Sequence, residues 1–353
     1  MRVLGIESSC DETAAAVVED GRRLLSNVVA SSMDIHVQYG GVVPEIAARS
    51  HIEAVMPVIQ QALDDADCTW DDIDAIAVTY GAGLNGSLLI GVLAARTLAI
   101  VKNKPLYAIN HVEGHIYANF LTETTLTGLT MRTSQPVFPM LGLIVSGGHS
   151  QLVVWRNHFD YTLLGQTLDD AVGEAFDKVA KILGLPYPGG ISVSVLAQQG
   201  DAKAFRLPKA RLEHKYDFSF SGLKTAVLRA AQEAVGRDYS LPSIQLPNML
   251  NDTQKANLAA SFERIAYETL VDKAVLAFEE FAPKSFVIGG GVAANAELRR
   301  QLAERIPLPI EYPDRKLCGD NGAMIATLGC FHMQHGRPTV DPFALETAPN
   351  LSM

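Results

Sequence analysis

The stretch RVLGIESSCDETAAAVVEDGRRLLSNVVAS, residues 2–31, decides how the chain begins to fold. Apolar runs at 2–6, 14–19 and 24–31 are separated by the polar loop 7–13 and by a turn signal. Short apolar runs bounded by turn residues are typical of β-strands. The stretch therefore predicts three consecutive strands, with an acidic loop between the first two.

A helix and a further α/β segment are expected next. Ser50 and Glu53 form a capping box, which predicts that a helix begins at Ser50. The apolar residues that share one face of this helix are Ile52, Val55, Met56, Ile59 and Leu63. Apolar runs separated by glycine-rich turns then predict a strand at 73–79, a helix at 87–102 and a strand at 106–109.

The second half of the chain repeats this order. Its predicted strands are 140–145, 151–155, 161–165, 285–288 and 310–312, and its predicted helices are 169–183, 258–281 and 295–305. Two halves of βββαβαβ type predict two mixed sheets flanked by helices, with a cleft between the halves. The expected domains are a first lobe at 1–125, a second lobe at 136–320 with an insertion at about 184–251, and a C-terminal helix and tail at 321–353 that packs on the first lobe.

Composition favours a well-buried enzyme. Of 353 residues, 48% are hydrophobic and 19% charged, which does not fit a disordered linker. The net charge of −10 means that a role with nucleic acid needs a local basic patch or helper subunits. The four cysteines contain no C-x-x-C pair, which indicates reduced, cytosolic usage. Because an apolar run typical of a strand begins at residue 2, no signal peptide is expected. Glycines interrupt the uncharged stretch 75–95, so no membrane span is predicted.

The sharpest local motif is His111-Val112-Glu113-Gly114-His115. On a helix, its two imidazoles lie one turn apart on one face, as metal ligands do. Asp320 follows the last strand of the second half, and His111 follows the last strand of the first half. The repeat therefore predicts that they lie together, in a site of two His and one carboxylate for Fe²⁺ or Zn²⁺. The simpler alternatives are two solvated histidines and an N-cap role for Asp320. The position of Glu113 does not fit a zinc protease, whose base adjoins the first His.

Glycine-rich turns and an acidic loop are further candidates. Turns at 81–83, 147–148 and 289–291 follow strands, where glycine lets backbone N–H groups approach phosphate or ribose. No G-x-x-x-x-G-K-[ST] is present, so nucleotide binding without a P-loop is predicted. Glu7, Asp11 and Glu12 are expected to bind a cation or act as a base, the alternative being solvated hairpin residues.

Basic residues gather in two places despite the acidic total. Arg206, Lys209, Arg211 and Lys215 precede Phe218 and Phe220, a mixture of side chains that suits RNA. The second cluster, around 299–316, is interpreted as a solvated helix face.

Taken together, the motifs resemble one family. They are residues 5–13, 40–45, 111–115, 145–149, 173–178, 187–190, 218–224 and 290–295, and they span nearly the whole chain in order. The pattern is similar to that of the tRNA N6-adenosine threonylcarbamoyltransferases (TsaD). The resemblance implies the actin/hexokinase/Hsp70 (ASKHA, ribonuclease-H-like) architecture: α/β, with duplicated actin-like lobes, a central cleft and a helical insertion in the second lobe.

The resemblance also implies an activity. Members transfer threonylcarbamoyl from threonylcarbamoyl-AMP to N6 of the adenosine 3′ of the anticodon, in tRNAs that read codons beginning with A, and release AMP. The implied metal ligands are His111, His115 and Asp320, holding one divalent ion per subunit, Fe²⁺ or alternatively Zn²⁺. The residues implied to bind the adenine nucleotide, threonylcarbamoyl-AMP or ATP, are Ile144, Val145, Ser146, Gly147, Gly148, Asp177, Gly190 and Asn295. We further expect Asp11 or Glu12 to orient or deprotonate a reactant.

Implied partners are tRNA, a paralogous actin-like protein (TsaB-like) and a P-loop ATPase (TsaE-like), in the cytoplasm and without a membrane. Departures from the common pattern are Ala82 in place of Pro, Asn110 in place of His, and the apolar Val193 and Val195 after Gly190. Two alternatives remain open: a small-molecule kinase of the same architecture, and a non-catalytic scaffold paralogue. The scaffold is expected to lose the metal ligands, and the kinase has no need of H-x-x-x-H.

Overall fold

The three strands predicted at the start of the chain form the centre of the first sheet. In the computed structural model, which describes residues 1–353, they are β1 (Arg2–Glu7), β2 (Glu12–Glu19) and β3 (Arg23–Ser31), joined antiparallel. β4 (Ala75–Gly81) and β5 (Leu106–Asn110) extend the sheet in parallel beside β1, and β6 (Glu123–Thr124) pairs with β3. The resulting order is β5-β4-β1-β2-β3-β6.

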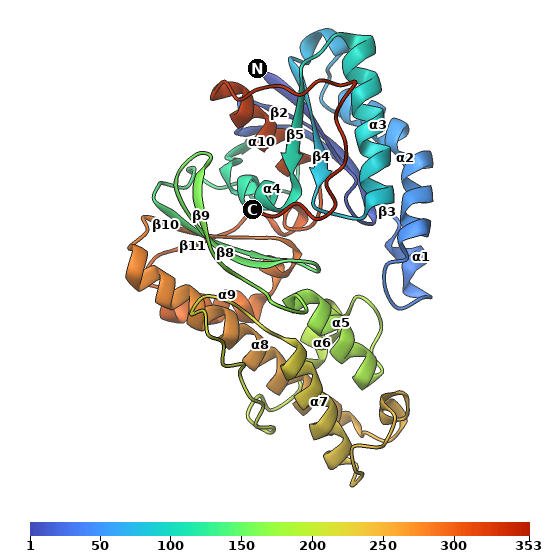
Figure 1. The fold of residues 1–353 in the computed structure, drawn as a ribbon, viewed down its shortest axis with the longest axis vertical. Helices are drawn as coiled ribbons and strands as arrows, with labels where there is room; N and C mark the ends of the chain where they lie inside the picture. The colour runs from blue at the N-terminus through green and yellow to red at the C-terminus, as the bar shows by residue number, and fades with distance from the viewer. The chain divides into compact units, whose positions relative to one another are not determined.

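Helices cover both faces of this sheet (Figure 1). α2 (Pro44–Asp65) and α3 (Asn85–Lys102) share a buried core with Leu4 and Ile6 of β1, and the short α1 (Met33–Val37) follows β3. α10 (Gly322–Gln334) packs against β1, β2 and β4, and α4 (His111–Tyr117) lies beside it. Because side chains alternate along a strand, Gly5 lies on the opposite face from Leu4 and Ile6, toward α10.

Gly5 allows the close approach of α10 to the sheet. A Cβ atom at Gly5 would lie 2.3 Å from the Ala326 nitrogen and 2.5 Å from the Gly322 oxygen, which is closer than non-bonded atoms approach. Gly322, at the start of α10, likewise allows close contact with β2, since its Cβ would lie 2.5 Å from backbone atoms of Ala15 and Ala16. The N-terminal end of α10, which follows Asp320, is thereby fixed against β1 and β2.

The second unit repeats the strand order of the first. β7 (Met140–Val145), β8 (Ser150–Asn157) and β9 (Asp160–Gln166) form an antiparallel meander, and β10 (Ser285–Gly289) and β11 (Ile310–Glu311) add in parallel beside β7. The order β11-β10-β7-β8-β9 matches β5-β4-β1-β2-β3 strand for strand. The duplicated α/β fold predicted from the sequence is therefore confirmed, whereas the cleft between the halves stays a prediction.

Five helices complete the second unit. They are α5 (Val172–Leu183), α6 (Gly189–Ala197), α7 (Ser221–Ala234), α8 (Asp252–Phe281) and α9 (Ala296–Arg305). The long α8 contacts α5, α6, α7, α9 and strand β7, so it organises this unit (Figure 1). α6 and α7 lie in the predicted insertion. Short 3₁₀ helices occur at Trp70–Asp72, Ala118–Phe120, Ser243–Asn248, Gly291–Ala294 and Arg315–Leu317.

The boundaries of the units differ from the expected ones. The first unit comprises Met1–Pro136 and Tyr312–Met353, and the second comprises Val137–Glu311, whereas the sequence places the second boundary at residue 320. The segment after β11 belongs with the first unit because Asp314 accepts a hydrogen bond from the Thr130 N–H at 2.9 Å and Lys316 donates to the Gly128 carbonyl at 3.2 Å.

The predicted start of α2 is wrong. The helix begins at Pro44, so Ser50 lies inside it and its hydroxyl donates to the Ile46 carbonyl instead of capping. Proline suits a first helical position because the missing N–H has no partner there. α3 is the one helix long and apolar enough to cross a membrane, and it packs against α2 and β4, as a core helix does.

The C-terminal tail is bound along the carboxyl ends of β4 and β5. Arg96 of α3 donates to the carbonyl oxygens of Pro342 at 2.5 Å, Phe343 at 2.8 Å and Leu345 at 3.3 Å. Further along, the Ala348 N–H donates to the Tyr80 carbonyl, and Asn110 donates to the Ser352 carbonyl. The tail therefore contacts the residue that directly precedes His111.

Candidate metal centre and nucleotide site

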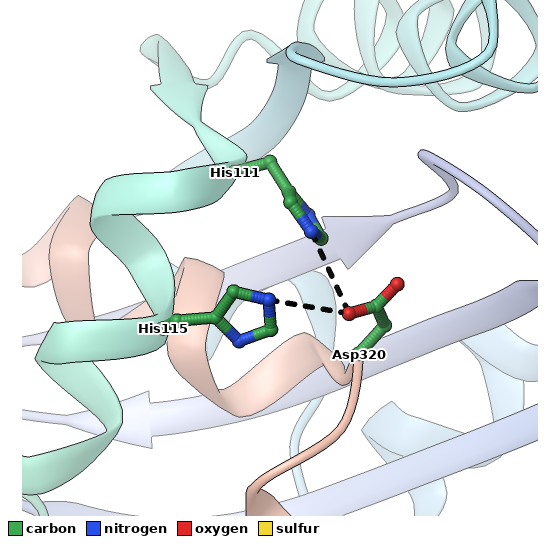
Figure 2. A group of neighbouring side chains, drawn as sticks. All are labelled: His111, His115 and Asp320. Carbon is green, nitrogen blue, oxygen red and sulfur yellow. Dashed lines mark ion pairs between the residues drawn. The ribbon is translucent and has the colours of Figure 1, made fainter. Parts of the chain in front are cut away.

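Two helix starts bring together the three predicted metal ligands (Figure 2). The Asn110 side chain accepts the Val112 N–H at 2.9 Å and so begins α4 at His111, which places His115 one turn later on the same face. Asn321 caps α10 by accepting the Met324 N–H at 3.1 Å. The cap of α10 is thus Asn321 and not Asp320, so the alternative in which Asp320 is an ordinary N-cap is wrong.

The three side chains converge on one point. Asp320 Oδ1 lies 3.5 Å from His111 Nε2 and 3.4 Å from His115 Nε2 (Figure 2). One ligand atom from each residue lies within 4.8 Å of the others, so small side-chain movements would allow a single ion, bound at about 2.0–2.2 Å, to contact all three. All three belong to the first unit, whereas the repeat predicts ligands from both halves.

A metal ion fits the buried state of His115. The ring is 1% exposed, and neither Nδ1 nor Nε2 has a hydrogen-bond partner. A buried polar atom without a partner costs free energy unless another ligand satisfies it. Nε2 faces the Asp320 carboxylate, so a cation between the two would satisfy both.

Glu7 fixes the orientation of His111. Its side chain is fully buried, with Oε2 3.0 Å from His111 Nδ1, and it accepts further hydrogen bonds from the Thr79 hydroxyl at 2.6 Å and the Ser9 N–H at 2.5 Å. A carboxylate only accepts, so Nδ1 donates to it and the lone pair of the neutral ring is on Nε2, toward Asp320. This carboxylate–histidine arrangement is the usual outer support of a metal ligand.

The site is strongly anionic. Burial acts to lower the pKa of His111, but the Glu7 and Asp320 carboxylates outweigh it and raise the pKa to about 9. Burial acts to raise the pKa of Glu7, while His111 lowers it, and the net pKa is below the usual range. Without a metal this pKa favours the protonated ring, and a divalent cation would displace the proton and leave the neutral, ligating ring.

Asp11 and Glu12 lie at the border of this anionic site. Burial, the Asp320 charge and the Asp11 charge together raise the pKa of Glu12 to about 9, while the Ser31 hydroxyl donates to Glu12 at 3.0 Å. Asp11 is buried, and its backbone carbonyl accepts from Ser32. The structure brings Glu12 near Asp320 and Asp11 near Glu12, but the catalytic role of both stays a prediction.

His51 is a buried residue of α2 that contacts the acidic loop. Thr13 Oγ1 lies 2.7 Å from its Nδ1, and its Nε2 lies 3.0 Å from the Cys10 carbonyl oxygen. The ring therefore links α2 to both ends of the loop that carries Asp11 and Glu12. Burial lowers the pKa of His51, which keeps the ring neutral. In the sequence, His51 lies on a helix face with both apolar and polar residues, so no sequence signal indicates these contacts.

Glu113 has surroundings that do not fit a protease base. Burial raises its pKa to about 7, and the charge that opposes this effect is Arg337, not a metal ligand. Glu113 is also not among the residues whose ligand atoms converge at this site.

The predicted phosphate turn of the second unit has an open backbone. Ile144 and Val145 are buried in β7, and Ser146 closes the turn by accepting the His149 N–H at 3.1 Å. Gly147 and Gly148 are exposed, and a Cβ at either would meet nothing within 4 Å. Gly173, near the start of α5, packs on this turn, since its Cβ would lie 2.8 Å from the Gly147 Cα.

Asp177 and Asn295 contact α6, the helix that contains Gly190. Asp177 of α5 accepts the Gly189 N–H at 2.7 Å, which places Gly190 beside it, and burial raises the pKa of this carboxyl. Asn295 Oδ1 caps α9 by accepting the N–H groups of Glu297 and Leu298.

The amide nitrogen of Asn295 is also engaged. It donates to Ser194 Oγ at 2.8 Å and to Glu263 Oε1 at 3.1 Å. Asn295 therefore joins α6, α8 and α9, a structural function that the sequence does not indicate.

The fold defines the class of protein. A duplicated sheet of this order is shared with full-length HypF in its phosphate- and nucleotide-bound form (TM-score 0.57, 12% identity, 95% of this chain and 47% of that one). It is also shared with the ROK hexokinase from Thermus thermophilus (TM-score 0.50, 17% identity, 95% and 100%). The chain is thus an actin-like α/β protein with a three-ligand candidate metal centre in its first unit.

Sequence comparison gives the family. Residues 23–327 match the model of TsaD, tRNA N6-adenosine threonylcarbamoyltransferase. Proteins of that name from Thermomicrobium roseum and Symbiobacterium thermophilum are each 50% identical, over 343 and 337 residues. The alignments cover 95% of this chain and 93% and 92% of the relatives. The chain belongs to the tRNA N6-adenosine threonylcarbamoyltransferase family, as its motifs predict, and members of this family bind a divalent metal and a nucleotide.

Proposed function

We propose that this chain transfers the threonylcarbamoyl group of threonylcarbamoyl-AMP to N6 of the adenosine 3′ of the anticodon, in tRNAs that read codons beginning with A. The new bond joins N6 to the carbamoyl carbon. The bond from that carbon to the phosphate oxygen breaks, AMP leaves with the electron pair, and the amine loses a proton. The observation that carries the proposal is the convergence of His111, His115 and Asp320 in a member of this transferase family.

His111, His115 and Asp320 are the proposed ligands of one divalent ion per subunit. The two imidazoles and one carboxylate leave open coordination positions and suit Fe²⁺, with Zn²⁺ as the alternative. Such an ion, when bound, stabilises negative charge on an oxygen of the substrate. Glu7 holds His111 in the ligating tautomer, and burial of His115 excludes water from the ring.

The second unit supplies the proposed nucleotide site. The exposed backbone of Gly147 and Gly148 suits phosphate oxygens, and Ile144, Val145 and Ser146 hold the turn in place. Asp177 would accept a hydrogen bond from a ribose hydroxyl, and Gly190, where a Cβ would meet nothing within 4 Å, would leave room for the nucleoside. Asn295 acts in this proposal by holding α6 against α9 through Ser194.

Asp11 and Glu12 are the proposed acceptors of the amine proton or the residues that orient a reactant. Both belong to the loop that His51 and Ser32 hold, and Glu12 lies in the field of Asp320. Replacement by Asn and Gln retains the shape of each side chain and removes its charge. Unchanged transfer rates in the double variant would exclude this role.

tRNA is the proposed macromolecular substrate, and a TsaB-like actin-like protein and a TsaE-like P-loop ATPase are the proposed partners. Apolar side chains on α2 and α3 support a partner for the first unit, because exposed apolar patches mark protein interfaces. They are Ile52, Met56, Leu89, Leu93 and Val101, all of them exposed. We place the protein in the cytoplasm, where tRNA is modified.

The test is transfer of labelled threonylcarbamoyl from its adenylate to unmodified tRNA, with the partner proteins present. Wild type is compared with His111→Ala and with His214→Ala, a control at an exposed histidine of the second unit. We expect label on tRNA with wild type and the control, and less than about one hundredth of it with His111→Ala. Phosphorylation of a small metabolite without transfer would favour the kinase alternative, and neither activity would favour the scaffold.

A further inference from the structure

The predicted RNA-binding cluster is reorganised in the structure. Lys209 is paired with Glu268 at 3.0 Å and Asp272 at 2.6 Å, and Lys215 is paired with Glu280. Phe218 and Phe220 are fully buried. These four side chains are therefore engaged within the second unit, and an RNA surface must be built from other residues.

A pocket beside α7 gathers basic side chains that are not engaged in this way. It has a volume of about 560 Å³ and lies between α7 and the chain at 206–208 (Figure 1 shows α7). Arg206 and Arg229 lie in its wall, with the exposed Tyr239 beside them. Ser221, Gly222 and Thr225, from the first turns of α7, complete the polar lining.

The two arginines are available for an anion. Neither forms an ion pair, whereas eight of the 17 arginines of this chain do. The Arg229 guanidinium lies 5.4 Å from the centre of the Tyr239 ring, which fixes its plane without neutralising its charge. The one carboxylate in the pocket, Glu233, accepts a hydrogen bond from the Tyr239 hydroxyl at 2.6 Å.

Charge is unevenly distributed along the chain. Residues 184–251 contain eight Lys and Arg against five Asp and Glu, whereas the whole chain contains 29 against 39. The insertion is therefore the positive part of an acidic protein. Because binding of a polyanion depends on local basic groups, this is the part of the chain best suited to a phosphate backbone.

We propose that the pocket formed by Arg206, Arg229 and Tyr239 binds the sugar–phosphate backbone of tRNA. Guanidinium groups match phosphate oxygens in a planar, bidentate way. The exposed Tyr239 offers a face on which an unpaired base stacks, a contact common to single-stranded RNA. The inference rests on the proposed function, which makes tRNA the substrate, and it places a contact for that substrate in the insertion.

Direct binding to an unmodified tRNA transcript tests the pocket. Fluorescence anisotropy at several salt concentrations compares wild type with Arg206→Ala/Arg229→Ala. We expect the double variant to bind about tenfold more weakly and the slope of log Kd against log salt to fall by about 2. Arg206→Lys/Arg229→Lys keeps the charges, so it retains the slope and loses only part of the affinity.

A matched control separates a local effect from total charge. Arg156→Ala/Arg300→Ala removes two positive charges from exposed, ion-paired positions in the same unit. We expect this control to bind tRNA as wild type does. Equal loss of affinity in both double variants would mean that net charge alone governs binding, which would overturn the pocket.

Transfer kinetics distinguish failure of the pocket from failure of the proposed function. In the pocket variant, KM for tRNA should rise about tenfold while kcat stays near wild type. Transfer by wild type together with an unchanged tRNA affinity and KM in the variant would overturn the pocket and leave the function standing. Absence of transfer by wild type would contradict the function, and the binding assay would still decide the pocket.

Binding of inorganic phosphate to the pocket without any effect of the variant on tRNA affinity would contradict the RNA assignment.

Discussion

Glu7 Oε2 lies 3.0 Å from His111 Nδ1, although 104 residues separate the two along the chain. The contact joins the end of the first strand to the start of α4 and determines which ring nitrogen of His111 faces Asp320. Glu7 is completely buried and accepts hydrogen bonds from Thr79 and Ser9 as well. The acidic loop and the H-x-x-x-H motif are therefore parts of one site.

Replacing Glu7 by Gln should weaken metal binding. The side chain keeps its volume but loses the charge that supports His111, and outer-shell changes of this kind cost about tenfold to a hundredfold in metal affinity. Competition with a chelator measures the affinity for Fe²⁺ and Zn²⁺. Glu19→Gln, at the far end of β2, is the control and should bind metal normally. Wild-type affinity in Glu7→Gln would show that the contact does not support a ligand.

Gly5→Ala should destabilise the first unit. The added methyl group collides with backbone atoms of Ala326 and Gly322, which no rotamer change relieves, so we expect a loss of about 3 kcal/mol in the free energy of unfolding. Denaturant titration measures it. Gly222→Ala, where a Cβ meets nothing within 4 Å, should change stability by less than about 0.5 kcal/mol. Equal stability of the two variants would mean that α10 shifts freely on the sheet.

Arg96→Ala should release the C-terminal tail. The guanidinium donates to three tail carbonyls, and hydrogen bonds to a charged group contribute about 1.5–3 kcal/mol in such positions. We expect a stability loss of about 2 kcal/mol and faster amide exchange at Ala348 and Leu351, whose N–H groups are bonded in the wild type. Unchanged exchange there would show that the tail is held by its other contacts. Arg49→Ala, which removes an exposed pair on α2, is the control.

His332 should make stability depend on pH. Burial, and secondarily Arg337, lowers its pKa to about 4 in the folded protein, below the usual value near 6.5. The unfolded chain therefore binds the proton more readily, and the stability that is fully present above about pH 6.5 is lost as pH falls toward 4.

Urea unfolding at about pH 7.5 and about pH 5 measures this effect. Between the two pH values, we expect the free energy of unfolding of His332→Asn to fall by roughly 1–2 kcal/mol less than that of wild type. The exposed His214→Asn should lose as much as wild type does. The same pH dependence in all three proteins would assign it to other groups.

Much of the fold was predictable because the strands are local apolar runs. The predicted strand at 140–145 coincides with β7, and α4 begins at the motif that predicts it. The duplicated order followed from the repetition of those runs. Asp320 was predictable as a candidate ligand because it comes after the last strand of the second half, although a 3₁₀ helix separates it from β11 whereas His111 directly follows β5.

The buried face of α2 was only partly predictable. Val55, Ile59 and Leu63 are buried as predicted, but Ile52 and Met56 are 60% and 50% exposed, and His51 is fully buried. Through its polar contacts with Thr13 and the Cys10 carbonyl, His51 occupies part of the buried face of the helix. Such contacts depend on residues far apart in sequence, as does the pairing of Lys209 and Lys215 with α8, so periodicity alone does not reveal them.

The most direct test of the account is transfer of threonylcarbamoyl to tRNA by metal-stripped and metal-reloaded protein, read as threonylcarbamoyladenosine by mass spectrometry. Wild type and Asp320→Asn are stripped with a chelator, reloaded with Fe²⁺ or Zn²⁺, and assayed with the adenylate. We predict that stripping abolishes transfer, that reloading restores it in wild type, and that Asp320→Asn neither retains the ion nor recovers. Full transfer by the stripped wild type, with no metal detected, would contradict the account.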